Sequence, residues 1–304
     1  MKTRLLLLLP LAMIAFAASP ILVRLAMAEA PQAPPLAIAF WRALWAIALL
    51  ALPVGIWRRE ELKRIRARDG LWIALAGAFL ALHFALWVYA LRYTSVASAS
   101  VLVSIHPIFI AILGYWWLRE RLSFAGGLGV ALATLGGALI GWGDARQASA
   151  SFPQAPLGNA LAVSSALCFA GYLLVGRLVR QRISWLLYVG LLYGVVALLL
   201  GVLLLAMGLA ATGYTRTFYG LCAFMALGPQ LIGHGTLNYL VRFLTPALVA
   251  LVVFSEPLLA SLMAYALWGE VPGLVSGLGM VLTLGGLLLA WWPRPSAAAR
   301  PRAE

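Results

Sequence analysis

The stretch SIHPIFIAILGYWWLRE, residues 104–120, decides the fold, because its pattern returns 150 residues later as FSEPLLASLMAYALWGE, residues 254–270. Both apolar runs contain a proline that follows an ionisable residue, and both end on a glutamate. Aligned without a gap, residues 92–142 and 242–292 share 13 identities, among them the proline, a tyrosine, the glutamate and a tryptophan. Shared hydrophobicity alone rarely matches these residue types, so the sequence predicts two related halves.

The composition is that of a membrane protein. The 304 residues are 64% hydrophobic and 10% charged, whereas about 25% of the residues of a soluble protein are charged. Ten apolar runs have about the twenty residues that a helix needs to cross a bilayer. The sequence therefore predicts an all-α membrane protein with ten transmembrane helices. The predicted spans are residues 5–27, 35–56, 71–91, 95–118, 123–142, 157–177, 184–208, 217–239, 245–267 and 273–292.

The first twenty residues, MKTRLLLLLPLAMIAFAASP, resemble a secretory signal peptide, with basic residues before an apolar run and small residues near Ala17. The apolar run continues to Met27, however, and so is long enough to span a bilayer. The repeat also requires a helix in this position. We therefore expect this segment to remain in the protein as its first transmembrane helix.

Basic residues are concentrated in alternate loops. With a cytoplasmic N-terminus, 17 of the 22 Lys and Arg residues lie on the inside, and only Arg92, Arg146 and Arg216 lie outside. This bias follows the positive-inside rule and predicts a multi-pass protein of the inner (cytoplasmic) membrane with both termini in the cytoplasm. It also explains the net charge of +13 without nucleic acid as a partner. The basic loop at residues 58–69 is either a plain topology signal or a contact with anionic lipid of the bilayer.

The stretch QASASFPQAPL, residues 147–157, is the clearest interruption of the apolar pattern. It separates five predicted spans from five. We expect a first repeat at residues 1–147, a linker at 148–156, a second repeat at 157–293 and a cytoplasmic tail at 294–304. Because each half has an odd number of spans, the second half must enter the membrane inverted, as in secondary transporters with a central binding site.

The chain resembles the drug/metabolite transporter (DMT) superfamily, of the type built from two EamA repeats. The segments that carry the resemblance are LRYTSVASASVLVSIHPIFIAILGYWWLRERLS, residues 91–123, and LVRFLTPALVALVVFSEPLLASLMAYALWGEVP, residues 240–272. The resemblance implies a transporter with a central cavity between two five-helix halves, lined in part by the third and eighth helices. It does not imply a particular substrate.

The residues before the two central prolines are the first candidates for function. Pro107 and Pro257 each remove a helical hydrogen bond and predict a kink, which leaves carbonyl groups near Val103 without partners. An ionisable residue at the membrane centre is costly, so Glu256 should face a cavity, be paired or be protonated. It is either a neutral group bonded at the kink or a site for proton coupling or a substrate amine. His106 is either simply hydrogen-bonded or functional.

Two arginines fall within predicted spans. Arg42 lies well inside its helix, where it pairs with Glu256 or binds a substrate carboxylate. Arg24 lies nearer the end of its helix, and we expect it to extend toward the membrane surface. We expect Glu270, at the end of a span, to cap a helix or pack a loop.

The third and eighth spans supply the remaining candidates. The third span carries His83, Trp87 and Tyr89, and the eighth carries Gln230, His234, Asn238 and Tyr239. Four-residue spacing puts His83 with Trp87 and His234 with Asn238 on one helix face. Such residues either line a cavity or join helices by hydrogen bonds. The glycines and proline of GPQLIGHG, residues 228–235, predict a bent eighth helix. Glycines such as Gly277 in the fifth and tenth spans predict close helix packing.

The sequence contains no recognised enzyme or metal-binding motif, and Cys168 and Cys222 fit buried thiols. We therefore expect no catalytic residue, cofactor or metal. The best prediction is a transporter, through family analogy an exporter, that moves small metabolites by alternating access. Neutral amino acids or similar zwitterions come first, because the midplane offers one acid, one base and a few polar groups. We expect a monomer or weak homodimer. The alternatives are a membrane-embedded enzyme acting on a lipid or lipid-linked substrate, and a structural or regulatory membrane protein.

Overall fold

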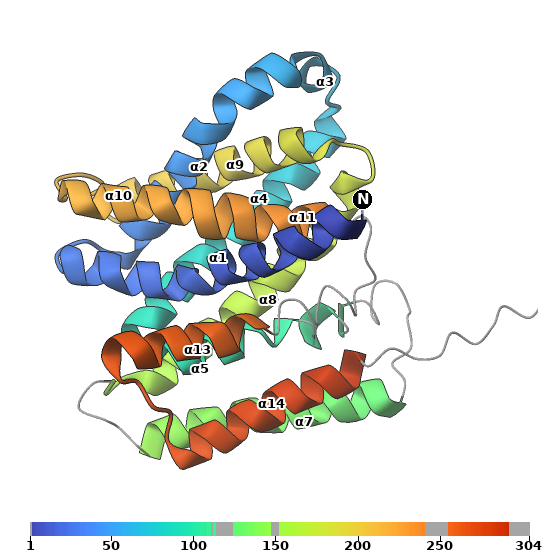
Figure 1. The fold of residues 1–304 in the computed structure, drawn as a ribbon. Coiled ribbons are helices and arrows are strands. Elements are labelled where there is room, and N and C mark those ends of the chain that lie inside the picture. Colours follow the sequence, from blue (N-terminus) through green and yellow to red (C-terminus); the bar gives the residue numbers. More distant parts are fainter. Residues whose placement is uncertain are drawn as a thin grey trace, which may run out of the picture.

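The computed structural model describes residues 2–106, 108–110, 112–113, 124–146, 152–240 and 255–291. Within these ranges every regular element is a helix (Figure 1). The elements of the first half are α1 (Lys2–Glu29), α2 (Pro35–Trp57), α3 (Arg59–Lys63), α4 (Ala67–Tyr93), α5 (Val96–Val103) and α7 (Phe124–Arg146). Those of the second half are α8 (Ala155–Arg180), α9 (Trp185–Ala206), α10 (Arg216–Met225), the π-helix η1 (Ala226–His234), α11 (Gly235–Leu240), α13 (Ser255–Trp268) and α14 (Leu274–Trp291).

Five of the described helices are long and apolar enough to cross a membrane. They are Pro10–Glu29, Pro35–Trp57, Ala67–Tyr93, Ala155–Arg180 and Trp185–Ala206. They coincide with the first, second, third, sixth and seventh predicted spans. Shorter apolar helices, Phe124–Ile140 and Leu274–Leu289, fall in the fifth and tenth. The prediction of an all-helical membrane protein is confirmed, whereas the number ten stays a prediction.

Local chemistry accounts for several helix ends. The Ser95 side chain accepts a hydrogen bond from the backbone N–H of Ser98 and so caps the start of α5. α5 ends at Val103, four residues before Pro107. A proline supplies no N–H for the carbonyl four residues earlier, which favours a helix end there. Pro107 itself lies outside the described residues, and Pro257 is buried in the first turn of α13.

Glycines bring α7 and α14 into backbone contact. A methyl carbon added to Gly136 would lie 2.5 Å from the carbonyl oxygen of Gly279, and one added to Gly286 would lie 2.7 Å from that of Gly129. Only glycine allows two helices to approach this closely. Gly277, by contrast, faces open space. The predicted close packing is therefore confirmed for these helices, but Gly277 is not one of the contact residues.

The α7–α14 contact relates equivalent positions of the two halves. Gly129 and Gly136 correspond to Gly279 and Gly286 at the offset of 150 residues, and each contact joins one position to the counterpart of the other. At the centre, the Thr283 hydroxyl donates a hydrogen bond to the carbonyl of Ala133, its own counterpart, at 3.4 Å. The two helices consequently run antiparallel and lie side by side at one edge of the bundle (Figure 1).

The other packing pairs show the same exchange between halves. α4 packs on α8, and α1 packs on η1 and α10, which occupy the place of α4 in the second half. In the same way α5 packs on α8, and α1 packs on α13. α2 contacts its counterpart α9, and α5 contacts α13. The first and third helices of each half therefore enclose the centre of the molecule together with those of the other half.

Gly279→Ala is expected to lower stability, because the new methyl would meet the backbone of α7 at 2.6 Å and force the helices apart. Overpacking of this kind costs about 1–3 kcal/mol. Gly277→Ala, two residues away on the same helix, should be neutral or stabilising. Thermal unfolding of both variants in one detergent would check the difference. Equal melting temperatures would contradict the proposed contact.

Candidate functional site

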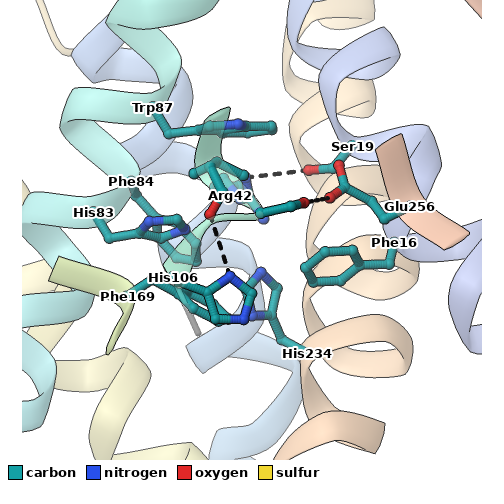
Figure 2. Close-up of a pocket in the computed structure, with 12 residues that line it drawn as sticks. Phe16, Ser19, Arg42, His83, Phe84, Trp87, His106, Phe169, His234 and Glu256 are labelled. Carbon is teal, nitrogen blue, oxygen red and sulfur yellow. Dashed lines mark hydrogen bonds between the residues drawn. The ribbon is translucent and has the colours of Figure 1, made fainter. Parts of the chain in front are cut away.

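A cavity at the centre of the bundle is lined by both halves (Figure 2). About 440 Å³ of empty space, open solvent included, lies between the lining atoms, so the enclosed part of the cavity is smaller than this figure. Its wall combines one base, one acid, three imidazoles, two hydroxyls and apolar, mostly aromatic side chains. The lining residues are Phe16, Ser19, Arg42, His83, Phe84, Trp87, Val103, Ser104, His106, Phe169, His234 and Glu256.

Arg42 is completely buried in this wall. It lies on the face of α2 that carries the small buried residues Ala39, Ala43 and Ala46, which let the neighbouring helices approach. Its Nε donates a hydrogen bond to Gln230 Oε1 at 2.8 Å, and Nη1 lies 3.5 Å from Ser19 Oγ.

Aromatic faces complete the surroundings of this guanidinium. Its central carbon lies 4.3 Å from the centre of the Phe84 ring and 5.8 Å from that of Trp87. Such contacts stabilise a buried cation. Nη2 has no hydrogen-bond partner among the residues that the structure describes. Arg42, a residue of the cavity wall, therefore carries a buried charged donor without a partner.

A π-helix delivers two residues to this region. η1 contains Pro229 between Gly228 and Gln230, and short π-helical insertions are frequent at functional sites. The Tyr193 hydroxyl donates a hydrogen bond to the carbonyl of Gln230 at 3.1 Å and helps to fix the widened turn. Gln230 meets Arg42, and His234 reaches the cavity wall. The eighth span thus departs from regular α-helical geometry through a π-helix, while the bend expected there stays a prediction.

The two motifs of the repeat meet at the cavity. Ser104, in SIHP, donates a hydrogen bond to Oε2 of Glu256, in the SEP of the second copy, at 3.3 Å. Glu256 is 2% exposed, and within the described chain no ion pair joins it to Arg42. His106 Nδ1 lies 3.2 Å from the carbonyl of Val103. The imidazole thereby satisfies a carbonyl that the following proline leaves free.

Imidazole and phenyl rings form one continuous wall. The Phe169 ring centre lies 4.6 Å from that of His106, 4.9 Å from that of His83 and 5.7 Å from that of His234. His234 also packs on Phe16 at 4.6 Å. His83 is held by Ser165, whose hydroxyl lies 2.7 Å from Nδ1. Among the described residues, no group of His, Cys, Asp or Glu has the arrangement of a metal site.

Most candidate residues from the sequence meet at this cavity, and three do not. Glu256, His106, Arg42, His83, Trp87 and His234 line it. Tyr89 packs at the edge of the hydrophobic core, and Tyr239 is 39% exposed. Asn238 is buried behind the wall, where its Oδ1 accepts a hydrogen bond from the Tyr172 hydroxyl at 2.6 Å.

Sequence reasoning missed several lining residues, and it named Gln230 as a polar residue of the eighth span without foreseeing its contact with Arg42. Phe16, Ser19, Phe84, Ser104 and Phe169 are lining residues of types that are common in any apolar helix. Gln230 lies behind Arg42 and supplies its hydrogen-bond acceptor. Its position in an apolar span, directly after Gly228–Pro229, was the one available signal.

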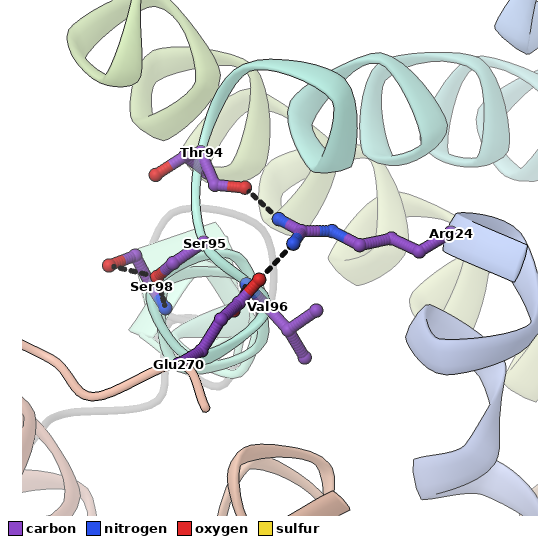
Figure 3. A network of polar contacts seen from close by, with 6 residues as sticks. All are labelled: Arg24, Thr94, Ser95, Val96, Ser98 and Glu270. Carbon is purple, nitrogen blue, oxygen red and sulfur yellow. Dashed lines mark hydrogen bonds and ion pairs between the residues drawn. The ribbon is translucent and has the colours of Figure 1, made fainter. Parts of the chain in front are cut away.

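A second polar network lies near the ends of α1, α4 and α13 (Figure 3). Arg24 pairs with Glu270 and donates a hydrogen bond to the carbonyl of Thr94. Glu270 Oε2 accepts a hydrogen bond from the backbone N–H of Val96, at the start of α5, at 3.1 Å. Arg24, which was expected to extend toward the membrane surface, is bound by a carboxylate and a carbonyl at helix ends, and its side chain is 13% exposed. The capping role expected of Glu270 is confirmed.

Comparison with known proteins identifies the family. The model of the EamA-like transporter family matches residues 3–142 and 156–292. A Streptantibioticus cattleyicolor protein named "Probable terminal-alkyne amino-acid exporter" is 28% identical over 247 residues, which are 80% of this chain and 78% of the relative. A Hamiltonella defensa subsp. Acyrthosiphon pisum protein named "Probable 4-amino-4-deoxy-L-arabinose-phosphoundecaprenol flippase subunit ArnE" is 29% identical over 73 residues, 24% of this chain and 66% of its own.

The fold is also found in a solved structure. A protein crystal structure with 17% sequence identity matches with a TM-score of 0.65, over 94% of this chain and 97% of that one. At this identity the likeness concerns the fold alone.

Tyr172→Phe is expected to destabilise the scaffold behind the cavity, because it removes the hydrogen bond to the buried Asn238. The loss should be about 1–3 kcal/mol, the cost of leaving a buried polar group unsatisfied. Tyr188→Phe is the matched control, since the buried Tyr188 hydroxyl has no partner in the described part of the chain. Thermal unfolding would compare the two, and an equal effect would argue against a structural role for the Tyr172–Asn238 pair.

Proposed function

Because the chain belongs to the EamA-like transporter family, within the DMT superfamily, we propose that it is a secondary transporter that exports a small zwitterion, such as a neutral amino acid. The observation that carries this proposal is the central cavity, where Arg42 and Glu256 face the same space without an ion pair between them. A carboxylate would bind the unused Nη2 of Arg42, and an ammonium group would bind Glu256. The name of the amino-acid exporter relative supports this substrate class.

The remaining lining residues would recognise the rest of the cargo. His83, His106, His234 and Trp87 border the cavity together with Phe16 and Phe169. These rings suit an uncharged side chain better than a second charge, because burying an unpaired charge is costly. A strongly anionic cargo would require more cations than Arg42 alone. Glu256, with Ser104 as its hydrogen-bond partner, is also the proposed site of proton coupling.

Transport would proceed by alternating access between two inverted repeats of five spans each. The antiparallel α7–α14 contact, in which equivalent residues meet, supports the inversion. The loop charges support ten spans in the inner membrane with both termini in the cytoplasm. The proposed partners are the cargo and the bilayer, and the proposed assembly is a monomer or a weak homodimer.

The proposed charge pairing predicts a defined ligand preference. Purified protein would be tested by thermal shift, and in liposomes by counterflow, with L-alanine, L-leucine and L-phenylalanine, their carboxamides and their N-acetyl derivatives. At least one free amino acid should bind about ten- to a hundred-fold more tightly than either derivative, because a hydrogen bond to a charged group contributes about 1.5–3 kcal/mol.

Two variants assign the preference to residues. Arg42→Gln should abolish the preference for the acid over its carboxamide, and Glu256→Gln the preference for the free amine over its N-acetyl derivative. Tyr89→Phe, outside the cavity wall, is the control and should retain both. Absence of any ligand preference in the wild-type protein would refute the zwitterion site.

A further inference from the structure

The charge on Arg42 is not cancelled by its protein partners. Its hydrogen-bond acceptors are the amide oxygen of Gln230 and the hydroxyl of Ser19, and Phe84 covers one face. No described acid forms an ion pair with it. Buried guanidinium groups are usually paired with a carboxylate, because an isolated buried charge is costly. The whole positive charge is thus kept at the cavity, which requires a compensating benefit.

We propose that Gln230 is the residue that makes the site selective for an anionic end of the cargo, an inference that rests on the proposed function. Gln230 holds Nε of Arg42 at 2.8 Å and leaves the unpartnered Nη2 for the cargo. Gln230 is itself completely buried, and its backbone carbonyl accepts a hydrogen bond from the Tyr193 hydroxyl. An amide orients the guanidinium without neutralising it, which a carboxylate in this place would do.

The side chain at position 230 therefore decides the charge that the cavity accepts. A glutamate there would form an ion pair with Arg42, occupy its donors and leave no net charge for a substrate carboxylate. A methionine of similar length would keep the charge but remove the acceptor that orients it. The two substitutions distinguish neutralisation of the Arg42 charge from loss of its orientation, because they are expected to affect acid and carboxamide ligands differently.

Gln230→Glu is expected to weaken binding of the preferred amino acid, taken from the alanine, leucine and phenylalanine series, by about tenfold or more. Binding of its carboxamide should change less than threefold, which also reports that the variant is folded. Gln230→Met should weaken binding of the free amino acid, but the variant should still bind the acid more tightly than its carboxamide. Thermal-shift titrations and liposome counterflow would measure the acid-to-carboxamide ratio of each variant.

The outcomes separate the two proposals. A wild-type acid preference that persists in Gln230→Glu overturns the role of Gln230 and leaves the zwitterion site intact. A wild-type protein without acid preference overturns both. A loss of preference in Gln230→Met equal to that in Gln230→Glu means that orientation alone accounts for the effect, and the charge argument is then wrong.

The Arg24–Glu270 network carries a second inference, which is independent of the cargo. Arg24 belongs to the first half and Glu270 to the second, and their side chains are 13% and 15% exposed. Arg24 lies five residues beyond the cavity residue Ser19 on α1, about 7.5 Å along the helix axis. The left-handed Gly269, with φ +65°, ends α13 directly before Glu270. The network therefore joins the two halves near one end of the bundle, beyond the level of the cavity residue Ser19 on α1.

We infer that this network is a gate, which must open for the cavity to reach that side of the membrane. It joins α1, the α4–α5 junction and the end of α13, and Thr94 extends it to α8 through a 2.8 Å hydrogen bond to Asn159. A partly buried ion pair is suited to this task, because hydration of the two separated charges offsets much of the attraction lost when the pair opens. Apolar packing would not be compensated in this way.

The gate is tested by the access of a membrane-impermeant thiol reagent to Phe16→Cys, placed in the cavity wall of a Cys168→Ala, Cys222→Ala background. Arg24→Gln and Glu270→Gln should each speed labelling about tenfold from one side of the membrane only. The double variant should be labelled no faster than either single variant, because both substitutions remove the same Arg24–Glu270 contact. Arg24→Lys, which retains an ion pair, should label close to the parent rate.

Control measurements separate a gate from loss of structure. Labelling of the native Cys222, which is completely buried, should stay slow in the Arg24→Gln and Glu270→Gln proteins that retain it. Unchanged labelling of Phe16→Cys in both single variants overturns the gate, as does equal acceleration from both sides. Additive acceleration in the double variant would show that Arg24 and Glu270 act separately.

Discussion

A complete guanidinium group inside an apolar helical bundle is the constraint on which the centre of this molecule depends. Arg42 needs acceptors that its own helix does not offer, and the surrounding helices supply them: Ser19 from α1, Gln230 from η1 and aromatic faces from α4. The π-helix is part of the same solution, because it contains both Gln230 and the cavity residue His234. The cost of burying the charge is reduced by these contacts but not removed.

The repeat divides the protein into parts that stay alike and parts that differ. Where the halves retain identical residues, as at Gly129 and Gly279, they form the seam between α7 and α14. Where the copies differ, as at His106 and Glu256, they form the cavity. Identity suits a symmetric backbone contact, whereas binding an asymmetric molecule requires different groups on its two sides. At this motif, the proposed substrate site therefore uses a difference between the two copies.

Much of the fold was accessible from the sequence, because apolar length and the positions of prolines and glycines determine where these helices form. The short helix α3 in the basic loop was not expected, since its five residues lack any apolar period. The pairing of Arg24 with Glu270 was not foreseen, because the two residues are 246 positions apart and no local pattern reports such a contact.

The sequence predicted which helices line the cavity, but it predicted less well which face of each helix does so. His83 and Trp87 share a cavity-facing surface as the four-residue spacing predicts. His234 and Asn238 do not, because the π-helix ends at His234 and Asn238 belongs to the next helix, where it binds Tyr172. Ser19 and Gln230 gained importance only through Arg42, and a partner of this kind becomes visible only when the helices are assembled.

Phe16 and Phe169 occupy corresponding places in the two halves, at an offset of 153 residues, and both border the cavity. In this structure they differ in surroundings: Phe16 packs on His234, whereas Phe169 contacts all three imidazoles. If the halves exchange conformations during a transport cycle, Phe16 would take up the surroundings that Phe169 has now, formed by the counterparts of those neighbours, such as Glu256 in place of His106. The cargo would then meet a phenyl surface of constant chemistry on either side of the membrane, while the charged groups around it change their spacing.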